Sequence, residues 1–119
     1  MAFSRRSLTL IVAAVAVLGT SAQAQTIPAG KQMRIIVPYS AGGTSDILGR
    51  KLAQQLGERL GRQVIVDNKA GAGGSIGTEA TVRSAPDGYT IVMGSTGPMA
   101  INPALIRLSY DPERDLAPI

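Results

Sequence analysis

The sequence predicts an α/β fold made of parallel β-loop-α units, and three observations indicate it. Apolar runs at residues 33–39, 63–68 and 89–95 are typical of buried strands. A glycine-rich loop follows each of the first two runs. A stretch with helical spacing then leads to the next run, which is the alternation of a parallel sheet. The length of 119 residues limits the chain to one domain or part of one.

The first unit begins with "MRIIVPY", which we expect to be a strand that ends near its proline, and residues 40–45 form the loop. A helix is predicted from Asp46, with Thr44 or Ser45 as its N-cap and Gly61 as its stop. The helix dipole favours the acid of Asp46, whose side chain we expect to point away from any ligand held at this loop. The apolar face of the helix is predicted to contain leucines spaced every four residues: Leu48, Leu52, Leu56 and Leu60.

The second unit repeats this order. "QVIVDN" is the predicted strand, residues 69–75 are the loop, and residues 76–85 are a shorter helix. The "PDG" sequence at residues 86–88 predicts a turn, because proline presets one dihedral angle and glycine allows positive φ. After the third strand, prolines restrict residues 97–106 to a short helix at most. Residues 109–119 are expected to be a loop that leads toward a further strand.

Residues 1–24 have the pattern of a secretory signal peptide, which predicts export. Arg5 and Arg6 supply the basic start, residues 8–19 are apolar, and "AQA" is the small-residue end that precedes cleavage. The apolar stretch is too short to cross a bilayer comfortably, which favours a cleaved leader over a membrane anchor.

Composition excludes several classes of function. The chain has no cysteine and no histidine, so it offers no thiol nucleophile, no histidine general base and no Cys/His zinc site. Without the two leader arginines, ten basic residues face eight acidic ones, and aromatic residues are sparse. We therefore expect no bound metal and no nucleic-acid partner.

The stretch "GAGGSIG", residues 71–77, admits three interpretations. A dinucleotide loop needs G-x-G-x-x-G, but Ile76 occupies the third glycine position and no acid closes the next strand. A serine hydrolase elbow needs G-x-S-x-G, which Gly73, Ser75 and Gly77 supply, although the chain has no histidine to deprotonate the serine. The third interpretation is an anion site. Under that interpretation we expect no cofactor and no catalysis.

An anion site needs the fewest additional assumptions. The first turn of a helix presents unpaired N–H groups with a partial positive charge, and bare glycines let a carboxylate approach them. Both loops follow strands of one parallel sheet, so both lie at its carboxyl edge, where ligands of open α/β sheets bind. Two such loops could hold both oxygens of one carboxylate. For any single glycine, a role in the turn alone is favoured over ligand contact, Ser75 is more often an N-cap than a ligand donor, and Asn68 is expected to shape the turn after its strand.

These residues closely resemble the N-terminal part of the Bug family, the periplasmic solute-binding proteins of tripartite tricarboxylate transporters. The resemblance rests on "VPYSAGGTSD", "VDNKAGAGGSIG", "APDGYT", "MGSTG", "INPAL" and "YDPERDLAPI", and it covers nearly all of residues 25–119. The departures are small. Tyr39 stands where phenylalanine is common, and Gly49 lowers the helix propensity of the first helix.

The resemblance implies a two-lobed periplasmic binding protein of type II, truncated here to the N-terminal part of its first lobe. It implies a receptor that delivers a small organic acid, either a di- or tricarboxylate or an amino acid, to membrane transporter subunits without performing chemistry. A receptor for a membrane signalling protein and a truncated serine hydrolase are the alternatives. We expect the chain alone to bind its ligand weakly or not at all. The ligand-binding residues implied are Tyr39, Ser40, Ala41, Gly42, Gly43, Thr44, Gly71, Ala72, Gly73, Gly74, Ser75 and Ser95.

Overall fold

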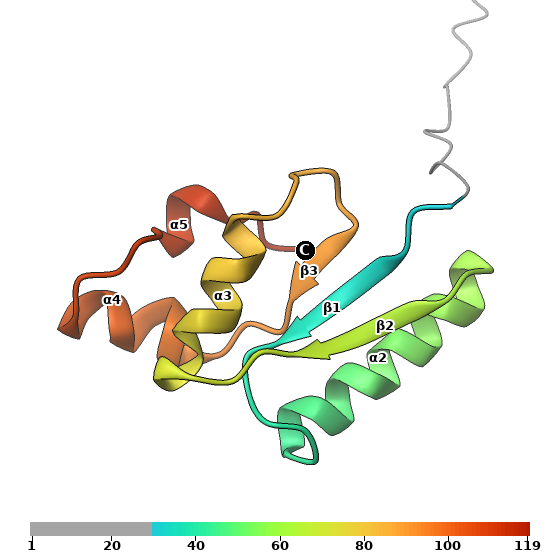
Figure 1. Cartoon of the computed structure of the whole chain (residues 1–119), viewed down its shortest axis with the longest axis horizontal. Helices are drawn as coiled ribbons and strands as arrows, with labels where there is room; N and C mark the ends of the chain where they lie inside the picture. Colours follow the sequence, from blue (N-terminus) through green and yellow to red (C-terminus); the bar gives the residue numbers. More distant parts are fainter. Residues whose placement is uncertain (1–29) are drawn as a thin grey trace, which may run out of the picture.

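The computed structural model describes residues 30–119, and the expected signal peptide lies outside the described residues. Three parallel strands form one sheet: β1 (Met33–Val37), β2 (Val64–Asn68) and β3 (Thr90–Val92). The strands stand in the order β2-β1-β3, with β1 in the middle (Figure 1). The α/β fold with a parallel sheet predicted from the sequence is therefore confirmed.

The strand register brings the carboxyl ends of the strands to one edge of the sheet. Met33 pairs with Val64 and Val37 pairs with Asn68, so β1 and β2 end together. On the other side of β1, Ile36 pairs with Val92 at the end of β3. The loops that leave the three strands are consequently neighbours in space, although they are far apart in the sequence.

One helix covers each face of the sheet. α2 (Thr44–Leu60) packs on β2 and β1, whereas α3 (Ser75–Val82) packs on β3 and β1. Figure 1 shows the two helices on opposite sides of β1. Ile35 and Val37 belong to the core beneath α2, and the alternation of a strand directs the buried Ile36 to the other face. The central strand is thus covered from both sides.

The face of α2 that meets the sheet differs from the predicted one. Gly49 and Ala53 are buried, whereas Leu48 and Leu52 of the predicted apolar face are 56% and 39% exposed. Leu56 is the predicted leucine that packs partly against the core. The prediction that the leucine row forms the buried face is therefore wrong.

The close approach of α2 to the sheet explains this difference. A Cβ atom on Gly49 would lie 2.8 Å from Cγ2 of Val37, closer than two carbon atoms pack. Glycine fits at this position because it has no side chain, and the tight contact with the strand offsets its low helix propensity. Larger residues on that face would hold the helix away from the sheet, so the leucines lie beside the contact instead.

The predicted C-terminal stop of α2 is confirmed, whereas its predicted N-cap is not. The helix stops at Gly61, whose left-handed φ of 61° and backbone N–H close the last turn, as predicted. At the other end Gly43 is the N-cap, and no side chain caps the helix. The prediction that Thr44 or Ser45 caps α2 is therefore wrong.

The region after β3 contains a helix that was not predicted. A π-helical turn, η2 (Gly97–Ile101), continues directly into α4 (Asn102–Leu105), which agrees with the short helix expected there. A further helix, α5 (Pro112–Asp115), lies within residues 109–119, where a loop was predicted. Asp111 caps α5 by accepting hydrogen bonds from two backbone N–H groups of the helix.

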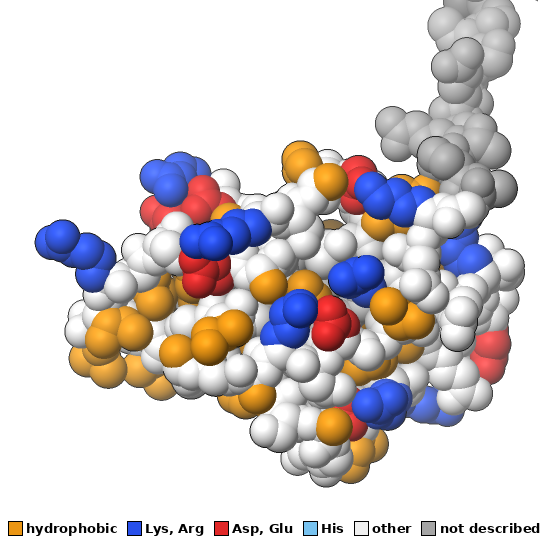
Figure 2. Space-filling model, in the orientation of Figure 1, with side chains coloured by type: hydrophobic (Ala, Val, Ile, Leu, Met, Phe, Trp, Pro, Cys, Tyr) orange, Lys and Arg blue, Asp and Glu red, His pale blue; other side chains and the backbone are white. Residues whose placement is uncertain are grey.

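Acidic and basic side chains are interspersed on the face of the molecule shown in Figure 2, and hydrophobic side chains gather over α4. The exposed fractions of Ile101, Leu105 and Ile106 are 49%, 74% and 53%. Among residues 30–119, no helix has the length and apolar character needed to cross a bilayer.

Candidate functional site

The loops that follow the three strands meet at the carboxyl edge of the sheet, and predicted ligand-binding residues from all three lie together there. The hydroxyl groups of Tyr39, after β1, and Ser95, after β3, are 2.6 Å apart. A Cβ atom on Gly74, after β2, would lie 3.3 Å from the hydroxyl of Tyr39. Glycine at this position therefore lets the second loop approach the tyrosine closely.

The second glycine loop is a left-handed turn that continues into α3. Gly71, Ala72, Gly73 and Gly74 have φ angles of 133°, 47°, 61° and 94°. The N–H of Gly74 donates to the carbonyl of Gly71 at 3.0 Å, and the N–H of Ser75 donates to the carbonyl of Ala72. These two N–H groups are used within the loop, while Ala72 and Gly73 lie on its exposed side.

The hydroxyl of Ser75 is buried and contacts two side chains from the C-terminal region. Its Oγ accepts a hydrogen bond from Nδ2 of Asn102 at 2.8 Å and lies 3.3 Å from the hydroxyl of Tyr110. Nδ2 of Asn102 also contacts the carbonyls of Ala72 and Gly73, at 3.3 and 3.4 Å, and so braces the left-handed turn. Ser75 is the first residue of α3, and its side chain does not cap that helix, contrary to one expectation.

The contacts of Ser75 do not favour the hydrolase interpretation. A catalytic serine needs a neighbouring group that removes its proton. Within residues 30–119, the two side chains that contact its hydroxyl are an amide and a phenol, and neither accepts a proton from serine at neutral pH.

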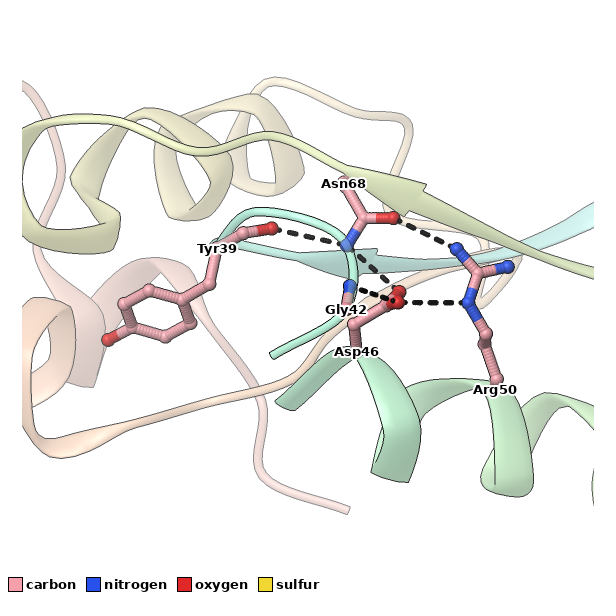
Figure 3. A network of polar contacts seen from close by, with 5 residues as sticks. All are labelled: Tyr39, Gly42, Asp46, Arg50 and Asn68. Carbon is pink, nitrogen blue, oxygen red and sulfur yellow. Dashed lines mark hydrogen bonds and ion pairs between the residues drawn. The ribbon is translucent and has the colours of Figure 1, made fainter. Parts of the chain in front are cut away.

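A network of polar contacts around Asp46 fixes the first glycine loop (Figure 3). Oδ2 of the carboxylate accepts hydrogen bonds from the backbone N–H of Gly42 at 2.8 Å and from Nε of Arg50 at 3.0 Å. Oδ1 accepts a hydrogen bond from Nδ2 of Asn68 at 3.0 Å, and the same Nδ2 donates to the carbonyl of Tyr39 at 3.1 Å. The side chain of Asp46 therefore faces protein donors, and it links the first loop to the end of β2.

The first loop exposes the N-terminus of α2. Residues 40–44 are exposed, and the first helical hydrogen bond runs from the N–H of Ile47 to the carbonyl of Gly43 at 3.0 Å. The N–H groups of Thr44 and Ser45 precede that bond and have no partner within the helix. Such N–H groups carry the partial positive charge of a helix N-terminus.

Asp46 is only 3% exposed, and its partners stabilise its ionised form. Hydrogen bonds from the Arg50 guanidinium and then from the Gly42 N–H lower the pKa of Asp46 from 3.8 to about 2. Because the pKa is lower in the folded chain than in the unfolded chain, ionised Asp46 stabilises the fold fully above about pH 4. This stabilisation is lost as the pH falls from about 4 toward 2.

We therefore expect the free energy of unfolding to fall less steeply between about pH 4 and pH 2 in Asp46→Asn than in the unmodified chain. Urea unfolding at a series of pH values measures both curves. The pKa values of Asp87 and Asp115 are also lowered, so both proteins lose stability in acid, and the difference between the curves reports on Asp46. Parallel curves would show that Asp46 contributes nothing to the acid dependence.

Three residues that shape the site were assigned no such role from the sequence, or a different one. Asn68 was expected to shape the turn after β2, and its side chain also reaches back to the first loop. Asn102 and Tyr110 contact Ser75 across 27 and 35 residues of sequence. Local patterns carry no information about contacts at that separation, so the roles of these residues can be recognised only in the folded structure.

Comparison with solved structures defines the class of protein. A periplasmic transporter shares 43% identity with this chain at a TM-score of 0.66, over 71% of this chain and 29% of that one. MatC of Rhodopseudomonas palustris, solved with bound malate, shares 28% identity at a TM-score of 0.68, over 74% and 30%. An R. palustris protein solved with adipate shares 34% identity at a TM-score of 0.66, over 71% and 29%. The fold of this chain is that of the corresponding part of periplasmic solute-binding proteins.

The family follows from the sequence. Residues 48–119 match the family described as the tripartite tricarboxylate transporter family receptor. BugT of Bordetella pertussis is 42% identical over 118 residues, which cover 96% of this chain and 36% of BugT. The chain belongs to this receptor family, and its resemblance to Bug proteins is confirmed. It spans about a third of the length of the curated relatives that it matches.

Proposed function

We propose that this chain provides the carboxylate-binding edge of a periplasmic receptor that delivers a small organic acid to the membrane subunits of a tripartite tricarboxylate transporter. The observation that carries the proposal is the convergence of three strand-ending loops at one sheet edge. Two relatives were solved with malate and with adipate, which are dicarboxylates. In this proposal residues 1–24 direct export, and residues 25–119 form the N-terminal part of one lobe.

The proposed site binds a carboxylate mainly through backbone N–H groups. The N-terminus of α2 and the exposed side of the second loop supply donors and a positive potential without a charged side chain. The hydroxyl pair of Tyr39 and Ser95 adds polar groups at the same edge. The proposed ligand-binding residues are those implied by the resemblance: Tyr39, Ser40, Ala41, Gly42, Gly43, Thr44, Gly71, Ala72, Gly73, Gly74, Ser75 and Ser95.

The N–H groups differ in how they could serve the ligand. Those of Gly42, Gly74 and Ser75 already donate to protein acceptors. We therefore assign the direct contacts to the N–H groups of Thr44, Ala72 and neighbouring exposed positions, and the remaining residues shape the loops. The proposed site performs no chemical step.

Addition of malate or adipate to the isotopically labelled chain is expected to shift the amide signals of both glycine loops in NMR spectra. Two charge-assisted hydrogen bonds contribute roughly 3–6 kcal/mol before the costs of binding. A dissociation constant of about 1 mM corresponds to about 4 kcal/mol. Because the costs of binding are subtracted from this gain, the expected affinity is about millimolar or weaker, which an NMR titration to high ligand concentration detects.

The diamide of adipic acid is the matched control, because it keeps the length of the ligand and removes its charge. It is expected to leave the loop amides unchanged. Ser75→Ala separates binding from hydrolysis: binding is expected to weaken less than about tenfold, because the backbone N–H groups assigned to the ligand remain and the lost hydroxyl is used by Asn102 and Tyr110. Shifts confined to other parts of the chain, or ester hydrolysis abolished by Ser75→Ala, would contradict the proposed function.

A further inference from the structure

Two side chains that lie outside the proposed ligand-binding set, Asp46 and Asn68, join the two glycine loops. We infer that this pair positions the first glycine loop against the end of β2 for carboxylate binding, so that Asp46 and Asn68 are positioning residues for a ligand that neither side chain touches. The inference rests on the proposed function. It assigns a role to the buried carboxylate of Asp46, which lies beside the proposed site for a carboxylate ligand.

The geometry ties the first loop at its start, its middle and its end. Nδ2 of Asn68 donates to the carbonyl of Tyr39, where the loop begins, and to Oδ1 of Asp46, where the loop has entered α2. Oδ2 of Asp46 accepts from the N–H of Gly42 in the middle of the loop. Asn68 is also the last residue of β2, and the second glycine loop follows it directly. A displacement of the first loop therefore requires this set of hydrogen bonds to break or rearrange, and the set also fixes the side chain of the residue from which the second loop starts (Figure 3).

The charges around Asp46 and Asn68 allow the carboxylate of Asp46 to lie near a site for a carboxylate ligand. An uncompensated carboxylate would repel an acidic ligand. Both oxygens of Asp46 face protein donors, and Arg50 supplies the compensating positive charge from the solvent side, where its side chain is 57% exposed. Arg50 also approaches Oδ1 of Asn68 at 3.4 Å, so the cation contacts both members of the pair.

A helix-dipole role would explain Asp46 alone, because acids are favoured in the first turn of a helix. It would not explain Asn68, which belongs to a strand and holds Asp46 and the Tyr39 carbonyl with one nitrogen atom. The two explanations make different predictions. If Asp46 acts only on the dipole, its hydrogen bond with the N–H of Gly42 is independent of Asn68, whereas a positioning pair makes that hydrogen bond depend on Asn68.

The test replaces Asn68 with alanine and measures by NMR how fast the amide of Gly42 exchanges with water in the absence of ligand. We expect exchange about tenfold faster, because Asp46 loses the contact that orients its carboxylate toward Gly42. Gln63→Ala is the matched control. It removes an exposed amide side chain just before β2, at the far end of the strand, and should leave Gly42 unchanged. Unchanged exchange of Gly42 in a folded Asn68→Ala would overturn the inference.

Malate added to the same three proteins tests the consequence for binding. We expect about tenfold weaker binding to Asn68→Ala than to the unmodified chain, and equal binding to Gln63→Ala. Equal binding to Asn68→Ala would overturn the inference. If malate shifts no loop amide in the unmodified chain, the proposed function fails instead, and the exchange of Gly42 still decides whether the pair positions the loop.

An acid titration of the unmodified chain covers the case in which Asn68→Ala does not fold. The backbone amide of Gly42 and the side-chain amide of Asn68 both donate to Asp46, so their NMR signals should shift with one common midpoint. Among residues 30–119, the charged group that contacts Asp46 is Arg50. Different midpoints for the two amides, or no shift of either one, would overturn the inference.

Discussion

Replacement of Ile35 with alanine is expected to lower the free energy of unfolding by about 2–5 kcal/mol. Ile35 is fully buried in the central strand and belongs to the core cluster with Val37 and Ala53 beneath α2. Truncation of its side chain removes buried apolar surface and leaves a cavity that the flanking strands cannot fill. Urea unfolding followed by circular dichroism measures the loss.

Leu48→Ala is the informative control, because the sequence predicted Leu48 as part of the buried face of α2. Its side chain is 56% exposed, so its truncation is expected to cost less than about 1 kcal/mol. If Leu48→Ala and Ile35→Ala were equally costly, α2 would contact the sheet through its leucine row, and the packing described above would be wrong.

Gly77→Ala is expected to lower the free energy of unfolding by about 1–3 kcal/mol, although alanine favours a helix by about 1 kcal/mol over glycine. A Cβ atom at this position would lie 2.8 Å from Cα and Cβ of Pro38 and 2.9 Å from the carbonyl oxygen of Lys69. Backbone atoms cannot move aside as a flexible side chain can, so α3 would have to shift. The second glycine loop leads into α3 and would shift with it. Urea unfolding gives the stability, and NMR shifts of the loop amides give the displacement.

Gly94→Ala is the matched control for this substitution. A Cβ atom on Gly94 would meet Cε of Met99 at 3.5 Å, an ordinary contact with a flexible side chain. Its effect on the free energy of unfolding is expected to stay within about 0.5 kcal/mol. A Gly77→Ala chain as stable as the unmodified one would mean that α3 lies farther from β1 than the structure places it.

Features encoded by a few consecutive residues were predictable from the sequence. The runs around Ile36, Val66 and Ile91 mark strands because apolar β-branched residues stand between turn residues. The stop of α2 at Gly61 and the positive φ of 78° at Gly88 follow from the conformational freedom of glycine. Once these elements alternate, the parallel sheet and the shared edge of its loops follow from topology.

Features decided by distant contacts were not predictable. The leucines of α2 fit a helical repeat, but the close approach of Gly49 to Val37 selects a different face. The contact between Asn68 and the Tyr39 carbonyl requires the two strands to be paired first. α5 is a different case, since Asp111 and Pro112 are a local helix-start signal that the prediction of a loop overlooked.

The position of β1 in the middle of the sheet has a consequence for the nascent chain. The ribosome makes β1 before β2 and β3, so its most buried side chains have no neighbouring strand when they emerge. Parallel pairing of β1 with β2 and β3 needs crossover connections, which must be synthesised first. At a synthesis rate of about 5–20 residues per second, β3 follows β1 on the order of seconds later. During that interval the segment from Met33 to Tyr39 is an exposed apolar peptide, suited to capture by a chaperone that holds unfolded chains.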